Sequence, residues 1–443
     1  MESKTVQVLL YIGALLAIIA MERTYRDDLY AYSLVQIKKI QANTNPDMIE
    51  FMMLVSDFGV ATLFIPLILT YLFSTKSRAY YYSVAVSINL YMMSIGKMGY
   101  HEPRPYMVDD DVQVYGCSKE FGQPSGHTFG SSTMILTVLF DVLKSYDHKQ
   151  LNGCSRVLYS MLALSAILLI GFSRLHNGDH TIDQIILGWQ FGIWQSFLMH
   201  FMIRDSLFQH IDRVTLQANS YNQSQKNSFK TIATCIFVAA MSSIIFTYQS
   251  VNDSFPVPMD WQIRLEAKCN VPVEYQMKFN TASFVQAGVF ALFFSGYIGC
   301  ISYGDSNLKD DMSTIAKTII TGLLSSIAAY PYLELAHLVD PYYGFFLCTT
   351  IPCLYFGFVM FYLADLIATK LGFNSAPPQS QISIDQKQIQ DYKSQYFISK
   401  QSLLQNPQQQ QYFESQKSDS TTITIEQGEP IVYVRQLSAN NLV

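Results

Sequence analysis

Ten apolar runs, most of them close to 20 residues long, limit what this chain can fold into more than any other feature. A run of about 20 mainly apolar residues is long enough to cross a bilayer as a helix, and these runs do not alternate in the way that the strands of a membrane barrel do. The sequence therefore predicts an all-α, polytopic membrane helix bundle with about nine or ten transmembrane helices. The runs lie near residues 6–21, 51–74, 79–96, 128–143, 157–172, 183–203, 231–248, 283–303, 315–337 and 342–369.

The composition agrees with a membrane environment. Charged residues make up 14% of the chain and hydrophobic residues 50%, whereas soluble domains carry about 25% charged residues. The net charge of −5 gives no support for nucleic-acid binding. None of the seven cysteines has the spacing of a metal site, and we expect neither a metal nor another cofactor.

The runs divide the chain into four parts. Residues 1–50 are predicted to hold an anchor helix followed by a loop over 22–50, and residues 51–205 to form the core that carries the polar stretches discussed below. The bundle as a whole is expected to contain a six-helix core. Further transmembrane helices follow over 206–370. Residues 371–443 are rich in Gln and Ser without an apolar period, which predicts a disordered tail.

Counting the spans places the polar loops 97–127 and 173–182 on the same face of the membrane. Lys and Arg are denser in the short loops of the opposite face, which marks that face as cytoplasmic. The polar loops are then luminal or extracellular, in an endomembrane or the plasma membrane, and the tail is cytoplasmic. Cys117 and Cys269 lie in loops of the luminal face, where they are either a disulfide, permitted by an oxidising compartment, or two free thiols.

Two of the polar stretches lie next to predicted spans and could bind an anion. Lys97 and Arg104 supply two positive charges, with prolines on both sides of Arg104 that hold the backbone extended. Ser125 is a good N-cap for the span that follows, and Gly126 lets the backbone approach a ligand closely. His127 falls in the first turn of that span, where it could protonate a leaving alkoxide near neutral pH.

The third stretch, over residues 173–184, adds another cation and a candidate nucleophile. Arg174 would supply a further phosphate contact, and His180 would attack. An imidazole nucleophile needs an acceptor that fixes its tautomer. Asp183 and Gln184 follow His180 by three and four residues, and both would be its neighbours on a helix.

The rest of that stretch argues against a metal enzyme. His176 and Asp179 are expected to be solvated loop residues rather than catalysts. Carboxylates are sparse around the histidines and no ligand spacing repeats, so a divalent metal is not expected. Three cations and two histidines on one face instead suit phosphoryl transfer, which needs fixed positive charge, an in-line nucleophile and an acid.

The order Lys-x6-Arg-Pro, Pro-Ser-Gly-His and Ser-Arg-x5-His resembles the signature of the type 2 phosphatidic acid phosphatase superfamily. The resemblance covers about residues 50–205. It implies a metal-independent phosphatase that forms a phosphohistidine on His180, with His127 as the acid for the leaving group and then the base for water. It also implies a set of residues that hold the phosphoryl oxygens, namely Lys97, Arg104, Ser125, Gly126 and Arg174.

The chain departs from this signature at one position. The common pattern has Asp four residues after the nucleophilic His, and here that residue is Gln184. Gln can accept a hydrogen bond from the ring but adds no negative charge. The glucose-6-phosphatase branch is similar in having Gln there, and Asp183 is the alternative orienting residue.

The substrate is less constrained than the reaction. A site at the membrane edge favours a phosphorylated lipid, of the phosphatidic acid or sphingoid-base phosphate class, with membrane lipid around the protein. The extra spans after residue 230 resemble the glucose-6-phosphatase and sphingosine-phosphate phosphatase branches, so a sugar phosphate is the alternative. A catalytically silent scaffold or transporter, and a vanadium-dependent haloperoxidase, are further alternatives. The sequence predicts neither protein partners nor an oligomeric state.

Overall fold

The computed structural model describes residues 2–145, 151–216, 220–269, 280–306, 308, 313–335 and 340–373. No β-strand occurs within these ranges. Six of their helices are long and apolar enough to cross a membrane, which confirms the prediction of an all-α, polytopic membrane protein. The predicted disordered tail lies outside the described residues from residue 374 onward.

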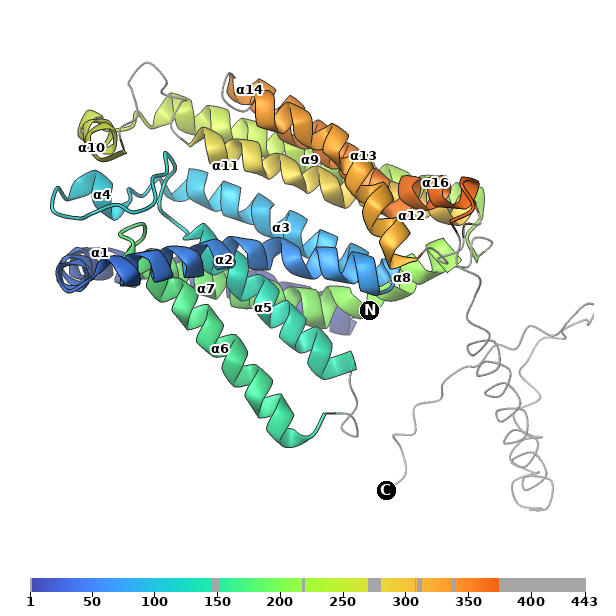
Figure 1. Cartoon of the computed structure of the whole chain (residues 1–443), viewed down its shortest axis with the longest axis horizontal. Helices are drawn as coiled ribbons and strands as arrows, with labels where there is room; N and C mark the ends of the chain where they lie inside the picture. Colours follow the sequence, from blue (N-terminus) through green and yellow to red (C-terminus); the bar gives the residue numbers. More distant parts are fainter. Residues whose placement is uncertain are drawn as a thin grey trace, which may run out of the picture. The chain divides into compact units, whose positions relative to one another are not determined.

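As far as the described residues extend, every predicted span coincides with a helix (Figure 1). The membrane-length helices are α1 (Glu2–Ala42), α2 (Pro46–Phe73), α6 (Gly153–His176), α9 (Gln223–Ser254), the run from α11 (Thr281–Gln286) through a 3₁₀ turn (Ala287–Phe290) to α12 (Ala291–Asp305), and the run of α14 (Pro341–Tyr343), a π-helix (Gly344–Thr350), α15 (Ile351–Phe358), a second π-helix (Val359–Leu363) and α16 (Ala364–Lys370). The other predicted spans fall in α3 (Lys76–Tyr100), α5 (Gly126–Ser145), α7 (Ile182–Phe197), which continues through a π-helix (Leu198–Ile203) into α8 (Arg204–Leu216), and α13 (Thr314–Leu335).

The helices α3, α5 and α7 form the centre of the bundle and carry polar residues on their buried faces. The amide of Asn89 on α3 donates to Gln195 Oε1 on α7 at 3.1 Å and to Thr133 Oγ1 on α5 at 3.0 Å. Both donors of this buried amide thus have a partner, as an apolar surrounding requires. This polar interior makes the three helices less apolar than the six membrane-length helices.

Small residues let α5 and α7 approach closely. Gly188 and Gly192 lie on the face of α7 that meets α5, and a Cβ at these positions would overlap Thr128 and Ser132 respectively. Because α5 and α7 both begin at the same end of the bundle, this close packing also brings their first turns together. Those turns hold Ser125–His127 and the residues that follow His180.

The prediction of a loop over 22–50 was wrong for most of its length. The chain stays helical to Ala42, and only residues 43–45 separate α1 from α2. Residues 22–42 contain neither Gly nor Pro, and their buried side chains pack against the polar loops; Ile37, for example, is fully buried with Tyr106. The helix persists because its second half has a protein surface to bind.

The predicted loop after α9 also contains a helix, α10 (Met259–Cys269), which packs against α4 (Pro105–Val108). A disulfide joins Cys117 to Cys269, so the two thiols that the sequence left open are paired. Figure 1 shows α4 and α10 at the same end of the bundle. The loop that follows the first motif is therefore covered by α10.

The C-terminal helices pack on α3 and belong to the same bundle. The ring of Tyr80 on α3 meets Phe361 edge-on, with centroids 5.6 Å apart. Gly296 and Gly299 on α12 lie against the same phenylalanine. This packing brings the C-terminal helices beside the motifs, where they form part of the cavity described next.

Candidate active site

The three motif stretches meet at one cavity of about 780 Å³. Lys97 comes from the last turn of α3, Arg104 from the linker before α4, and Arg174 from the last turn of α6. We call these three residues the cationic cluster. Of the nine residues predicted from the sequence, six line the cavity, namely Lys97, Arg104, Gly126, His127, Arg174 and His180. The other three, Ser125, Asp183 and Gln184, lie buried behind it.

Gln184, and not Asp183, contacts the ring of His180. Its Oε1 atom lies 3.1 Å from His180 Nδ1, and its amide nitrogen donates to the carbonyl of Pro103 at 2.8 Å. The backbone N–H of Thr181 also points at Oε1, at 3.4 Å. If the amide were inverted, its NH₂ group would face the N–H of Thr181 and its oxygen would face the carbonyl of Pro103. Neither pair can form a hydrogen bond, so these neighbours fix the amide orientation.

That orientation decides the tautomer of the ring. Because Gln184 Oε1 can only accept, His180 Nδ1 must carry the hydrogen, and Nε2 then keeps its lone pair. Arg104 Nη1 lies 3.3 Å from Nε2 and also donates to the backbone oxygen of Asp179 at 3.3 Å. The lone pair of His180 therefore faces the cationic cluster.

The environment of His180 favours the neutral ring. Burial, and then the nearby charges of Arg104, Arg174 and Lys97, lower the pKa of this histidine well below its ordinary value. Both effects disfavour protonation of the ring, which would add a positive charge beside the cationic cluster. A neutral imidazole with a free lone pair at Nε2 has the form that a nucleophile requires.

A glycine makes room for Gln184. A Cβ at Gly122 would lie 2.5 Å from Gln184 Oε1 and 2.6 Å from its nitrogen, closer than real Cβ contacts come. The backbone N–H of Gly122 donates to the carbonyl of Glu102 at 2.8 Å, which fixes the loop in this place. The sequence alone gave no reason to single out this glycine.

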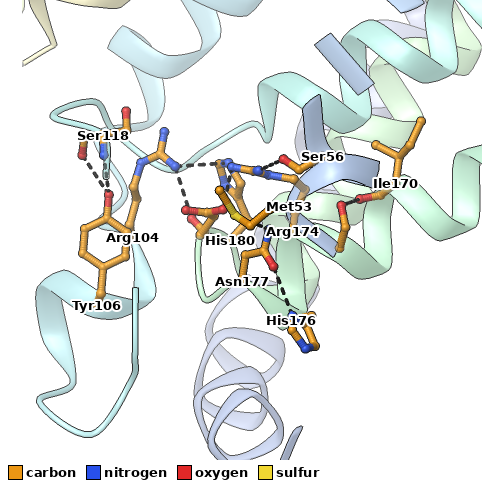
Figure 2. A network of polar contacts seen from close by, with 12 residues as sticks. Met53, Ser56, Arg104, Tyr106, Ser118, Ile170, Arg174, His176, Asn177 and His180 are labelled. Atoms are coloured by element: carbon orange, nitrogen blue, oxygen red, sulfur yellow. Dashed lines mark hydrogen bonds and ion pairs between the residues drawn. The ribbon is translucent and has the colours of Figure 1, made fainter. Parts of the chain in front are cut away.

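Arg174 is held from two sides by residues that the sequence reasoning did not assign. It donates to Ser56 Oγ on α2 and pairs with Asp179 Oδ2 at 2.8 Å. Figure 2 shows Arg174 between Ser56 and the turn that carries His180. The backbone carbonyl of Arg174 also accepts from the N–H groups of Asp179 and His180, at 3.1 and 3.3 Å.

The prediction that His176 and Asp179 are solvated was wrong, because both are buried. Asp179 neutralises Arg174, and His176 contacts Asn177 Oδ1 at 3.0 Å and Thr44 Oγ1 at 3.1 Å. A buried guanidinium needs a partner, and Asp179 is five residues away. The need of Arg174 for a nearby carboxylate was therefore the feature of the sequence that could have predicted a buried Asp179.

Glu120 is a second carboxylate that the sequence reasoning missed. It is 6% exposed and lines the cavity, where it forms an ion pair with Lys97 and lies 3.6 Å from Arg104 Nη2. Arg104 Nε also donates to the backbone oxygen of Glu120 at 3.0 Å. Two members of the cationic cluster are thus already paired within the protein.

The start of α5 offers donors to the same cavity. The hydroxyl of Ser125 is buried and has no hydrogen-bond partner in the described part of the chain, while its N–H donates to the carbonyl of Gln184 at 3.1 Å. The first N–H groups of a helix have no acceptor within the helix, and Gly126 opens α5. A Cβ at Gly126 would lie 2.6 Å from Met93 Sδ, so a larger residue does not fit there.

The second half of α1 connects the loops that carry the motifs. Buried Glu22 accepts hydrogen bonds from Arg26 and from Gln123, the residue before the second motif. Arg26 forms an ion pair of 2.7 Å with Glu102, two residues before Arg104. These contacts could not be foreseen from a sequence segment that was predicted to be a loop.

The fold and the site together define an integral membrane protein whose cavity gathers three cations and two histidines at one end of a helix bundle. Residues 78–207 match the model of the PAP2 superfamily. This region contains all three motifs, so the resemblance to that superfamily seen in the sequence is confirmed.

The chain is also similar to a solved structure, described as the first transmembrane PAP2 type phosphatidylglycerolphosphate phosphatase from Bacillus subtilis. The two share 16% sequence identity, and the match covers 43% of this chain and 93% of the other, with a TM-score of 0.36. No curated protein matches this chain.

Proposed function

We propose that this protein is a membrane phosphomonoesterase that forms a phosphohistidine on His180 without a metal ion. The observation that carries the proposal is the chain of contacts from the Pro103 carbonyl through Gln184 to His180, which leaves the Nε2 lone pair facing the cationic cluster. The match of residues 78–207 to the model of the PAP2 superfamily supports the same reaction class.

In the first step, His180 Nε2 attacks phosphorus, and the bond from phosphorus to the ester oxygen breaks. The electron pair stays on that oxygen, and His127 gives it a proton. In the second step, a water attacks the phosphohistidine, His127 takes the proton of the water, and the bond from nitrogen to phosphorus breaks. Inorganic phosphate leaves, and both histidines return to their starting forms.

The other cavity residues would stabilise the charge on the transferred group. Lys97, Arg104 and Arg174 supply fixed positive charge to the non-bridging oxygens, which is the main requirement of phosphoryl transfer. The hydroxyl of Ser125 and the N–H groups at the start of α5, from Gly126 onward, add donors at a helix N-terminus, a favourable place for an anion.

The cavity supports a phosphorylated lipid as substrate. Away from the cationic cluster its lining is mainly apolar and comes from two sides, including Leu63 and Leu90 on α2 and α3, and Val289 and Phe356 from the C-terminal helices. A phosphatidic acid or sphingoid-base phosphate could place its head group among the cations and its chain along this lining. Burial of each chain CH₂ would contribute about 0.8 kcal/mol.

A sugar phosphate is the second candidate. Asp57, Gln286 and Thr349 also line the cavity, and they could bind the hydroxyl groups of a sugar. Gln184 at the position usually held by Asp points in the same direction, since the resemblance to the glucose-6-phosphatase branch rests on it.

We also propose that the site faces the lumen or the outside of the cell, with the tail in the cytoplasm. The disulfide between Cys117 and Cys269 lies beside the site, because Cys117 lines the cavity, and disulfides persist in oxidising compartments. The density of Lys and Arg on the opposite face supports the same orientation. On this view residues 51–205 are the catalytic core, and 206–370 complete the cavity around it.

The test compares wild-type protein with His180→Ala in detergent or nanodiscs, with a chelator present throughout. Phosphate release is measured from phosphatidic acid, sphingosine phosphate and glucose 6-phosphate, and acid-labile labelling of the protein is measured after quenching. We expect release and labelling by the wild type only. His200→Ala is the matched control, because His200 contacts Phe140 and Phe201 away from the cavity lining.

If His180→Ala released phosphate at the wild-type rate, the phosphohistidine mechanism would be refuted. An absence of release from every ester would favour the silent scaffold. Adding vanadate separates the remaining alternative, because vanadate inhibits a phosphatase and supports halide oxidation by a haloperoxidase.

A further inference from the structure

Glu120 occupies an unexpected place for a carboxylate, because it faces the cavity that is proposed to bind an anion. Its Oε2 atom pairs with Lys97 Nζ and lies 3.6 Å from Arg104 Nη2. These are two of the three cations that would hold the phosphoryl group. A phosphate bound to them would therefore share both cations with a negative charge that belongs to the protein.

The carboxylate is held in place on its other side. Oε1 accepts from Ser283 Oγ on α11 at 2.8 Å, and Oε2 lies 3.5 Å from Ser118 Oγ. The preceding residue is also fixed, since the carbonyl of Lys119 accepts from the N–H of Asn280 at 2.8 Å. A side chain with contacts to both of its oxygens is a fixed part of the site rather than a plug that a substrate displaces.

The carboxylate is in its charged form. Burial by itself would raise the pKa of Glu120, but the adjacent charges of Lys97 and Arg104, together with the hydrogen bond from Ser283, hold it below its ordinary value. The charged carboxylate thus offsets one unit of positive charge in the cationic cluster.

Such a charge has a consequence for a phosphatase. Inorganic phosphate carries the same oxygens as the substrate's phosphoryl group, so contacts that bind the substrate also retain the product. Binding energy that is equal for the ground state and the transition state adds nothing to turnover once the site is filled. Arg174 already has Asp179 as its counter-ion. If Lys97 and Arg104 had no internal anion beside them, the site would release phosphate slowly.

We infer that Glu120 is a built-in counter-ion of the phosphate site: it positions Lys97 and Arg104 and weakens the binding of inorganic phosphate so that the product can leave. This inference rests on the proposed function, because it assumes that phosphate binds at the cationic cluster. Glu120 is a positioning residue in this scheme and takes no part in bond making.

The test uses the purified full-length protein and inorganic phosphate, with affinity measured by titration calorimetry. We expect Glu120→Gln to bind phosphate at least about tenfold more tightly than the wild type, which corresponds to about 1.4 kcal/mol, and to have a lower kcat. Ser283→Ala is the matched control, because it removes a hydrogen bond to the same carboxylate but keeps the charge. Its phosphate affinity should stay within about twofold of the wild type.

A purely structural role predicts the opposite sign, since a distorted site binds phosphate more weakly. Weaker or unchanged binding by Glu120→Gln, or equal tightening by Ser283→Ala, would overturn the inference and leave the proposed function standing. If Glu120→Gln does not fold, the same comparison is made between Lys97→Met and Lys97→Met/Glu120→Gln, and the double variant must bind phosphate more tightly. Wild-type protein that neither binds phosphate nor hydrolyses an ester would overturn both proposals.

Discussion

Replacing Gln184 with Glu would test the link between the orienting side chain and the nucleophile. The change keeps the size of the side chain in the space beside Gly122, and it places a negative charge about 3.1 Å from His180 Nδ1. At that distance and an effective dielectric constant of about 20, two unit charges attract by roughly 5 kcal/mol. This figure is an upper bound, and a single opposite charge usually shifts a pKa by about 1–3 units.

The direction in which the pH profile should move follows from the protonation state in which His180 reacts. Burial and the nearby Arg104, Arg174 and Lys97 lower the pKa of His180 below its ordinary value of about 6.5. Attack needs the neutral ring, so the acid limb of kcat/KM in the wild type should lie below that pH. A carboxylate at position 184 favours the protonated ring and raises the pKa, and the acid limb should move to higher pH by about 1–3 units.

The assay is the pH profile of kcat/KM, which reports the groups of the free enzyme. Gln184→Leu is the control, because it removes the acceptor without adding a charge. It should lower kcat by about 10- to 100-fold, as the loss of an orienting contact typically does, and leave the acid limb at or below its wild-type pH. An acid limb that stays in place or moves downward in Gln184→Glu would refute the assignment of His180 as the neutral nucleophile oriented by Gln184.

Three further predictions test the surroundings of the site. Gly122→Ala should displace Gln184 and lower kcat/KM by about 10- to 100-fold, whereas Gly153→Ala, where a Cβ meets nothing within 4 Å, should have no effect. Cys117→Ser should cost about 2–5 kcal/mol of stability, seen as a lower Tm; a wild-type Tm that a reductant does not change would contradict this. Glu22→Gln should lower the Tm and kcat together, because it removes the buried charge that binds Arg26; an unchanged Tm would show that α1 does not hold the motif loops.

Much of the site could be predicted from the sequence because its chemistry needs rare residue types. Lys97, Arg104 and Arg174 stand out because cations are expensive near apolar spans, and their fixed spacing in the motifs carries the superfamily resemblance. The all-α fold follows from the length of the apolar runs, since a backbone in lipid must satisfy its own hydrogen bonds. These features depend on short stretches of sequence, so they can be predicted without the tertiary structure.

The partners of those residues could not be predicted, because they depend on which loops meet in space. Glu120 is one acidic residue among several in the stretch between the first two motifs, and only the fold places it against Lys97. The same holds for Asp179, whose burial beside Arg174 contradicts its polar, loop-like sequence context. A carboxylate in a loop is usually solvated, so the sequence predicts exposed side chains at these positions. Only the tertiary structure shows that other elements cover the loops.

Tertiary contacts decided one choice that the sequence left open and reversed one prediction. Helical spacing makes both Asp183 and Gln184 neighbours of His180, but the Pro103 carbonyl and the space left by Gly122 bring the Gln184 amide to the ring. The second half of α1 is helical because it has the motif loops to pack against. The sequence by itself determined the reaction-bearing residues and the membrane helices; the packing of distant segments decided how those residues are charged, oriented and neutralised.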